Sequence, residues 1–172
     1  MDYQSLKDEF KKAFGYEGDR VYFAPGRINL IGEHTDYNGG HVFPCAITMG
    51  TYGVYKARDD NQVRVYSANI PDAGVLTFPI DKLDFDKNDN WDKFPRGVMY
   101  EMAKQGKTVD HGFDLFVHGD LPDASGLSSS ASIELLIGNI LNKEFNWGVD
   151  QLTLVKNGQA VENDYLGLNT GI

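Results

Sequence analysis

The chain has 172 residues, a formal net charge of −9 and a single cysteine. This length suits one domain with an ordinary core, and no stretch approaches the ~20 apolar residues that span a bilayer. Nucleic-acid binding is disfavoured because it needs a basic surface, and the lone Cys45 excludes an internal disulfide and fits a reducing compartment. The charged opening residues lack the apolar segment of a signal peptide. We therefore expect a cytoplasmic protein without nucleic-acid or membrane partners.

The predicted elements begin with a helix and continue with β-rich runs. Tyr3, Leu6, Phe10 and Phe14 recur at helical spacing, and this helix should end at Gly15. Alternating or β-branched residues predict strands over 21–24, 41–48, 52–56, 63–66, 75–80 and 112–117. Helices are predicted over 97–104, from residue 133 onward and over 150–166. Strands first and helices later favour a two-layer α+β domain.

The segment 24–40 is the first to carry chemistry. It reads Ala-Pro-Gly-Arg-Ile-Asn-Leu-Ile-Gly-Glu-His-Thr-Asp-Tyr-Asn-Gly-Gly, with its charged residues set between glycines that suit tight backbone geometry. The carboxylates of Glu33 and Asp36 and the imidazole of His34 can hydrogen-bond several hydroxyls of a small polyol. Charged turns are common, so an exposed polar turn with a satisfied histidine stays open as an alternative.

The second such segment, 120–132, is rich in glycine and serine and runs directly into the helix from residue 133. Small residues let a ligand approach the backbone, and a helix N-terminus offers unpaired N–H donors and the positive end of a dipole. These features predict a phosphate cradle that is not a Walker A loop, because the lysine pattern is absent. A serine-capped helix after a loop is the alternative, although one serine oxygen suffices for a cap.

The third feature is Glu162 in the predicted helix over 150–166. At ~100° per residue, Leu152, Leu154 and Val161 share one half of this helix, and Glu162 projects from the middle of that apolar half. An inward carboxylate must be hydrogen-bonded, paired or bound to a metal. A hard cation that bridges phosphate oxygens is one such partner, and a plain buried hydrogen bond is the alternative.

Together these segments resemble the galactokinase family, a branch of the GHMP kinases. Residues 26–37 are similar to the galactokinase signature, 126–131 to the superfamily's phosphate loop, and 162–167 with 171–172 to the run that leads into the catalytic segment. The resemblance spans the chain and implies a two-layer α+β fold of the ribosomal protein S5 domain 2-like type, a mixed sheet with helices packed on one side. Residues 1–172 would be the amino-terminal domain, which binds sugar and ATP phosphates and packs against a carboxy-terminal domain absent from this chain.

Carried over by position, the resemblance implies a role for each motif residue. Arg27 would stabilise the transition state beside the reacting hydroxyl. The sugar would be held by Glu33, His34, Thr35, Asp36 and Gly171. ATP would be bound by Ser67, Trp91, Phe94, Ala124, Ser125, Gly126, Leu127, Ser128, Ser129 and Ser130. Phe94 stands where the family usually has tyrosine, so stacking survives without the hydroxyl. Mg²⁺ would be coordinated by Ser130 and Glu162.

The implied reaction is ATP-dependent phosphorylation of α-D-galactose at its 1-hydroxyl. In the family, the motif that ends in Gly-Ile continues into Met-Asp-Gln, whose aspartate is the base, whereas this chain stops at Ile172. We therefore expect residues 1–172 alone to be inactive. Two alternatives stay open: a non-catalytic galactose and ATP sensor of the same family, and a kinase for a related sugar such as N-acetylgalactosamine.

Overall fold

Five strands form one mixed sheet in a computed structural model that describes residues 2–32, 35, 38–121, 129–168 and 170. The strands are β1 (Arg20–Asn29), β2 (Pro44–Ala57), β3 (Gln62–Ser67), β4 (Leu76–Pro79) and β5 (Phe113–Gly119). They lie in the order β1-β2-β5-β3-β4, and every neighbouring pair is antiparallel except β3 and β5, which run parallel. The predicted α+β class with a mixed sheet is confirmed.

The helices follow the predicted order. They are α1 (Tyr3–Phe14), α2 (Lys93–Ala103), α3 (Ser129–Glu144) and α4 (Gln151–Ala160), with a short 3₁₀ turn η2 (Pro71–Ala73) and a π-helical turn η3 (Val161–Tyr165) after α4. Asp2 caps α1 by accepting the N–H of Ser5, and Gly15 ends this helix with φ of 88°. Within the described ranges, no helix is long and apolar enough to cross a membrane.

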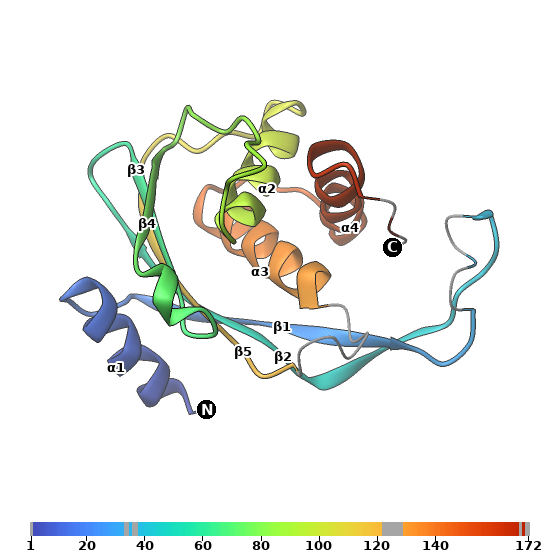
Figure 1. Ribbon diagram of the computed structural model, residues 1–172, viewed down its shortest axis with the longest axis horizontal. Helices are drawn as coiled ribbons and strands as arrows, with labels where there is room; N and C mark the ends of the chain where they lie inside the picture. Colours follow the sequence, from blue (N-terminus) through green and yellow to red (C-terminus); the bar gives the residue numbers. More distant parts are fainter. Residues whose placement is uncertain (1, 33–34, 36–37, 122–128, 169, 171–172) are drawn as a thin grey trace.

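The sheet buries side chains on both faces, because successive residues of a strand point to opposite sides. Tyr55 of β2 and Leu115 of β5 belong to the main core, which α2 and α3 cover. Val54 and Phe116 belong to a smaller core with the apolar stripe of α1. Figure 1 shows α1 on one side of the sheet and α2, α3 and α4 on the other. The expectation of helices on one side therefore holds for the later helices and not for α1, whose stripe buries the opposite face.

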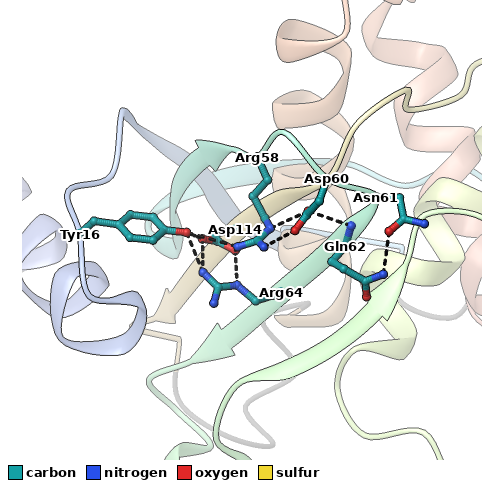
Figure 2. A network of polar contacts seen from close by, with 7 residues as sticks. All are labelled: Tyr16, Arg58, Asp60, Asn61, Gln62, Arg64 and Asp114. Atoms are coloured by element: carbon teal, nitrogen blue, oxygen red, sulfur yellow. Dashed lines mark hydrogen bonds and ion pairs between the residues drawn. The ribbon is translucent and has the colours of Figure 1, made fainter.

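A network of polar side chains ties the end of α1 to the sheet (Figure 2). Asp114 of β5 has no solvent exposure and receives two hydrogen bonds of 2.7 Å from the guanidinium of Arg64. Arg58 approaches the same carboxylate at 3.3 Å, and the hydroxyl of Tyr16, just after α1, also donates to it. The buried charge is thus compensated by two cations and a hydroxyl.

The long strand β2 merges two predicted runs into one. The predicted break falls at Gly50, where a side chain is excluded because a Cβ would lie 2.1 Å from the carbonyl oxygen of Ala24. Glycine here permits close pairing with β1 and does not end the strand. The far ends of β1 and β2 continue past the helices as an arm (Figure 1), on which the apolar side chains of Leu30, Ile31 and Phe43 are exposed.

Candidate active site

Arg27 is positioned by an irregularity in β1. The pairing of β1 with β2 changes register between Pro25 and Arg27, with Gly26 between them. Such a bulge locally twists a strand and redirects side chains. Arg27 is half-buried and, together with Pro25, lines a cavity on the face of the sheet that carries α3 and α4.

This cavity has a volume of about 230 Å³ and joins the distant motifs of the chain. Its wall includes Arg27 from β1, Ala131, Ser132 and Glu134 from α3, Gly158 from α4 and Glu162 from the π-turn. Small-molecule sites usually occupy ~300–1,000 Å³. The cavity is somewhat smaller than this range, and two residues predicted to act in catalysis and metal binding, Arg27 and Glu162, line the same space.

Glu162 lies in a π-helical turn and not in the regular helix predicted over 150–166. Two hydrogen bonds from residues that follow Glu162 hold the turn, since Tyr165 donates its hydroxyl to Leu83 O at 2.6 Å and Asn163 accepts the N–H of Thr170 at 2.8 Å. π-turns of this kind occur often at functional sites. The predicted burial of Glu162 is confirmed, because only 7% of the residue is exposed. The predicted burial of Leu152 is wrong, because it is 59% exposed in the first turn of α4.

The start of α3 lies beside the cavity. Ser129 and Ser130 form its first turn, so the helix begins four residues before the predicted start at residue 133, and the following Ala131 lines the cavity wall. Ser132 anchors this turn to the sheet, because its hydroxyl lies 2.9 Å from both Ala24 O and Thr51 Oγ1. The helix N-terminus is thus fixed next to the bulge of β1, and a helix N-terminus in general favours an anion.

Glu134 is a residue of this cavity that the sequence reasoning missed. It is 3% exposed, and its Oε1 has no hydrogen-bond partner among the described residues. Burial, and next the charge of Glu162, raise the pKa of Glu134 to about 9. The signal was present in the sequence: Glu134 precedes Ile137 by three residues and Leu141 by seven, which places a carboxyl on the buried stripe of α3.

Five predicted ATP-binding residues lie outside the wall of this cavity: Ser129 and Ser130 in the first turn of α3, and Ser67, Trp91 and Phe94. Ser67 is buried at the end of β3, where its hydroxyl accepts the N–H of Asn69 at 3.3 Å. Trp91 is 5% exposed, and its indole N–H is unpartnered among the described residues. Phe94 lies one turn further on, with the ammonium of Lys93 at 5.5 Å from its ring centre. The contact of Ser67, Trp91 and Phe94 with a nucleotide base stays a prediction.

Among the predicted sugar-binding residues, the structure describes Thr35. Its hydroxyl oxygen lies 2.5 Å from Gly32 O and 2.8 Å from His41 O, so it closes the loop of the arm. The predicted sites at Glu33, His34, Asp36, Gly171 and residues 124–128 (Ala124, Ser125, Gly126, Leu127 and Ser128) lie outside the described residues.

The cavity meets one requirement of a magnesium site. Glu134 and Glu162 offer carboxylate oxygens, which Mg²⁺ prefers, and an oxygen of Glu134 is buried without a partner in the part of the chain that the structure describes. The described residues contain no group of three or more His, Cys, Asp or Glu that could hold a metal. A cation in this cavity would need further ligands from water or phosphate, which is how Mg²⁺ is usually held in phosphoryl-transfer sites.

Comparisons with known proteins place the chain in a family. The galactokinase galactose-binding signature matches residues 8–57, and the GHMP kinases N terminal domain matches residues 93–172. A galactokinase of Levilactobacillus brevis is 64% identical over 172 residues, which cover 100% of this chain and 44% of that protein. The chain thus spans less than half the length of this relative.

Solved structures of known proteins share the fold of this chain. The crystal structure of Lactococcus lactis galactokinase complexed with galactose matches with a TM-score of 0.93 and 46% identity, covering 98% of this chain and 44% of that one. Methanococcus jannaschii mevalonate kinase shares the fold, with a TM-score of 0.75 at 18% identity, over 88% of this chain and 48% of that one. The chain therefore belongs to the GHMP kinases, within which it matches the amino-terminal part of the galactokinases.

Proposed function

We propose that the whole protein is a galactokinase that transfers the γ-phosphoryl group of ATP to the 1-hydroxyl of α-D-galactose, giving galactose 1-phosphate and ADP, the step that opens the Leloir pathway. The observation that carries this proposal is that Arg27 and Glu162, from motifs far apart in the sequence, line one cavity beside the N-terminus of α3. The relative from Lactococcus lactis was crystallised with galactose, which supports this sugar as the acceptor.

Arg27 acts on the charge that develops during transfer. The 1-hydroxyl oxygen bonds to the γ-phosphorus, the bond to the bridging oxygen of ADP breaks, and the hydroxyl proton passes to a base. The resemblance assigns that base to an aspartate that would follow Ile172. The guanidinium of Arg27 neutralises the equatorial phosphoryl oxygens in a site that excludes water, where such stabilisation is strongest.

The other roles follow the same assignment. Glu33, His34 and Asp36 orient the sugar, with Thr35 holding their loop closed. Residues 124–130, up to the first turn of α3, bind the phosphates of ATP through backbone N–H groups and serine hydroxyls. Ser130 and Glu162 would hold a Mg²⁺ ion, which would supply charge neutralisation during phosphoryl transfer. The lone cysteine, exposed and unpaired, supports a cytosolic location.

The remainder of the protein packs against the arm of β1 and β2. Three large apolar side chains are exposed there: Leu30 at 61%, Ile31 at 73% and Phe43 at 61%. Apolar residues gathered in this way are uncommon on a free surface and mark an interface. The curated relatives are more than twice as long as this chain, so the proposed occupant is their carboxy-terminal part.

Substitution of Arg27 tests this function in the full-length protein. Arg27→Ala should lower kcat by roughly 100-fold or more, because loss of one preorganised donor to the transition state typically costs that much. Arg20→Ala is the matched control, since Arg20 lies on the same strand, pairs with Glu144 and is absent from the cavity wall. Its kcat should stay within about twofold of wild type.

If the Arg27→Ala variant kept a near-wild-type kcat, the proposed role of Arg27 in catalysis would be wrong. The same ADP assay separates the alternatives. A sensor binds galactose and ATP and makes no ADP, whereas a kinase for N-acetylgalactosamine prefers the 2-substituted sugar.

A further inference from the structure

Glu134 places a carboxyl group in the interior of the protein at an electrostatic cost. Only 3% of the residue is exposed, and Oε1 finds no donor among the described residues. A buried polar atom without a hydrogen bond is costly, and a buried charge without a partner costs more. The neighbouring Glu162 adds a second carboxyl to the same cavity, which increases the cost of ionising both.

Two of the cavity residues near Glu134 do not relieve this cost. The hydroxyl of Ser132 is engaged with Ala24 and Thr51. On the α4 side Glu134 meets Gly158, where a Cβ would lie only 3.4 Å from Glu134 Oε2, so α4 supplies close packing and no side-chain donor at this position. The fold therefore brings two carboxyl groups together in a lined space and leaves an oxygen of one of them unused.

The position of Glu134 on α3 indicates a role for Oε1, the oxygen that lacks a partner among the described residues. Glu134 follows Ser130 by four residues, so the two side chains share one face of the helix. Glu162 faces the same cavity from the π-turn. A divalent cation between Ser130 and Glu162 would thus have Glu134 beside it, and hard cations favour carboxylate oxygens either directly or through a bound water.

We propose that Glu134 is the second carboxylate of the divalent-cation site, facing the ion from α3 while Glu162 faces it from the π-turn. This inference rests on the proposed function, because it adds a residue to the magnesium site assigned there. It assigns to Glu134 the role of a cation ligand, through its own oxygen or one water, and explains why an acidic residue occupies the buried stripe of α3.

Cation affinity tests the proposal more directly than activity. Mn²⁺ replaces Mg²⁺ in the full-length protein with a non-hydrolysable ATP analogue, and electron paramagnetic resonance measures the free ion. Glu134→Gln keeps the shape and removes the carboxyl group that would ionise on binding the cation, so it should weaken Mn²⁺ binding by about 10- to 100-fold, as loss of a supporting group in a metal site does. Without metal, its Tm should equal or exceed that of wild type, because an unpaired buried carboxyl is gone.

Glu101→Gln provides the matched control. Glu101 is 5% exposed on α2, pairs with Lys104 and does not line the cavity. Its substitution therefore removes an equally buried carboxylate from elsewhere, and Mn²⁺ affinity should not change. Circular dichroism of each variant confirms that the fold is intact.

Glu162→Gln separates failure of this inference from failure of the proposed function. If Glu162→Gln weakens Mn²⁺ binding and Glu134→Gln leaves it within twofold of wild type, Glu134 is not a cation ligand and the inference is overturned. If neither substitution weakens binding, the cation site assigned under the proposed function is wrong as well. Weakening by both substitutions, with Glu101→Gln unchanged, supports the pair.

Discussion

At the scale of single residues, burial of charge distinguishes two sites on opposite faces of the sheet. Asp114 is fully buried but held by Arg64, Arg58 and Tyr16 on the face that carries α1. Glu134 is nearly as buried on the other face and lacks such partners among the described residues. A buried carboxylate with cationic and hydrogen-bonding partners stabilises one arrangement of the chain, whereas a buried carboxyl group without such partners is suited to binding a ligand.

Substitution of Asp114 should reduce stability without changing catalysis. Asp114→Asn leaves two partly buried guanidinium groups without their shared charge, and removing one member of a buried ion pair costs about 3 kcal/mol. The Tm of the full-length protein should fall accordingly, while KM for each substrate stays unchanged because the network lies away from the cavity. Asp60→Asn is the control, since Asp60 is an exposed partner of Arg58 and its loss should lower Tm much less. Equal Tm values for the two variants would contradict this account of the network.

At the scale of elements, the π-turn is held by the close approach of α2. Gly97 makes this approach possible: a Cβ there would lie 2.7 Å from Val161 Cγ1 and 2.9 Å from the ring of Tyr165. Both neighbours belong to the turn that carries Glu162. The packing of α2 therefore sets the position of a residue in the cavity.

Gly97→Ala should displace the π-turn. Overpacking of this kind costs about 1–3 kcal/mol, and the shift of Glu162 should also weaken Mn²⁺ binding in the presence of an ATP analogue. Gly138→Ala is the matched control in the interior of α3, because a Cβ there would lie 3.4 Å from Leu154, an ordinary contact. Because alanine has a better helix propensity than glycine, Gly138→Ala should leave the free energy of unfolding unchanged or raise it by up to about 1 kcal/mol. Denaturation that finds the two variants equally stable would show that Gly97 does not constrain the turn.

Elements with strong local signals could be predicted from the sequence, and those that depend on distant contacts could not. The apolar spacing of α1 encodes local structure, and this helix was found at the expected residues, whereas α3 was found as a helix but begins at Ser129, four residues earlier than predicted. A helical wheel of 3.6 residues per turn cannot predict a π-turn. The π-turn here depends on the hydrogen bond between Tyr165 and Leu83 and on the hydrogen bond between Asn163 and Thr170. The continuity of β2 through Gly50 likewise depends on how closely β1 approaches.

The candidate site was predictable to a similar extent. The motifs named Arg27 and Glu162, and the structure brings them to one cavity. Nothing in either motif specified that Glu134 would join them, because that contact arises from the packing of α3 against α4 and the π-turn. A search for charged residues on predicted apolar stripes would have found it.

At the scale of the whole molecule, we propose that the chain provides one wall of a larger site. The cavity of about 230 Å³ is small for a hexose with ATP, and the relatives extend to more than twice the length of this chain. The exposed apolar residues of the arm, Leu30, Ile31 and Phe43, fit the same conclusion. Catalysis should therefore require the remainder of the protein.

Comparison of the two lengths tests this requirement. Residues 1–172, purified alone, should produce no ADP above background with galactose and MgATP, because the proposed base and part of the nucleotide site are missing. The full-length protein in the same assay provides the positive control, and circular dichroism establishes whether the shorter chain is folded. Turnover by residues 1–172 at a rate near that of the full-length protein would mean that the described cavity is sufficient.

The position of the transferred phosphoryl group tests the central claim most directly. Phosphorus NMR of the full-length protein with MgATP and galactose should show a phosphomonoester coupled to the anomeric proton, formed in equal amount to ADP, and 1-deoxygalactose should give no product. Phosphorylation at another hydroxyl, or ADP formed equally without sugar, would contradict the assignment of this fold and cavity to galactose 1-phosphate formation.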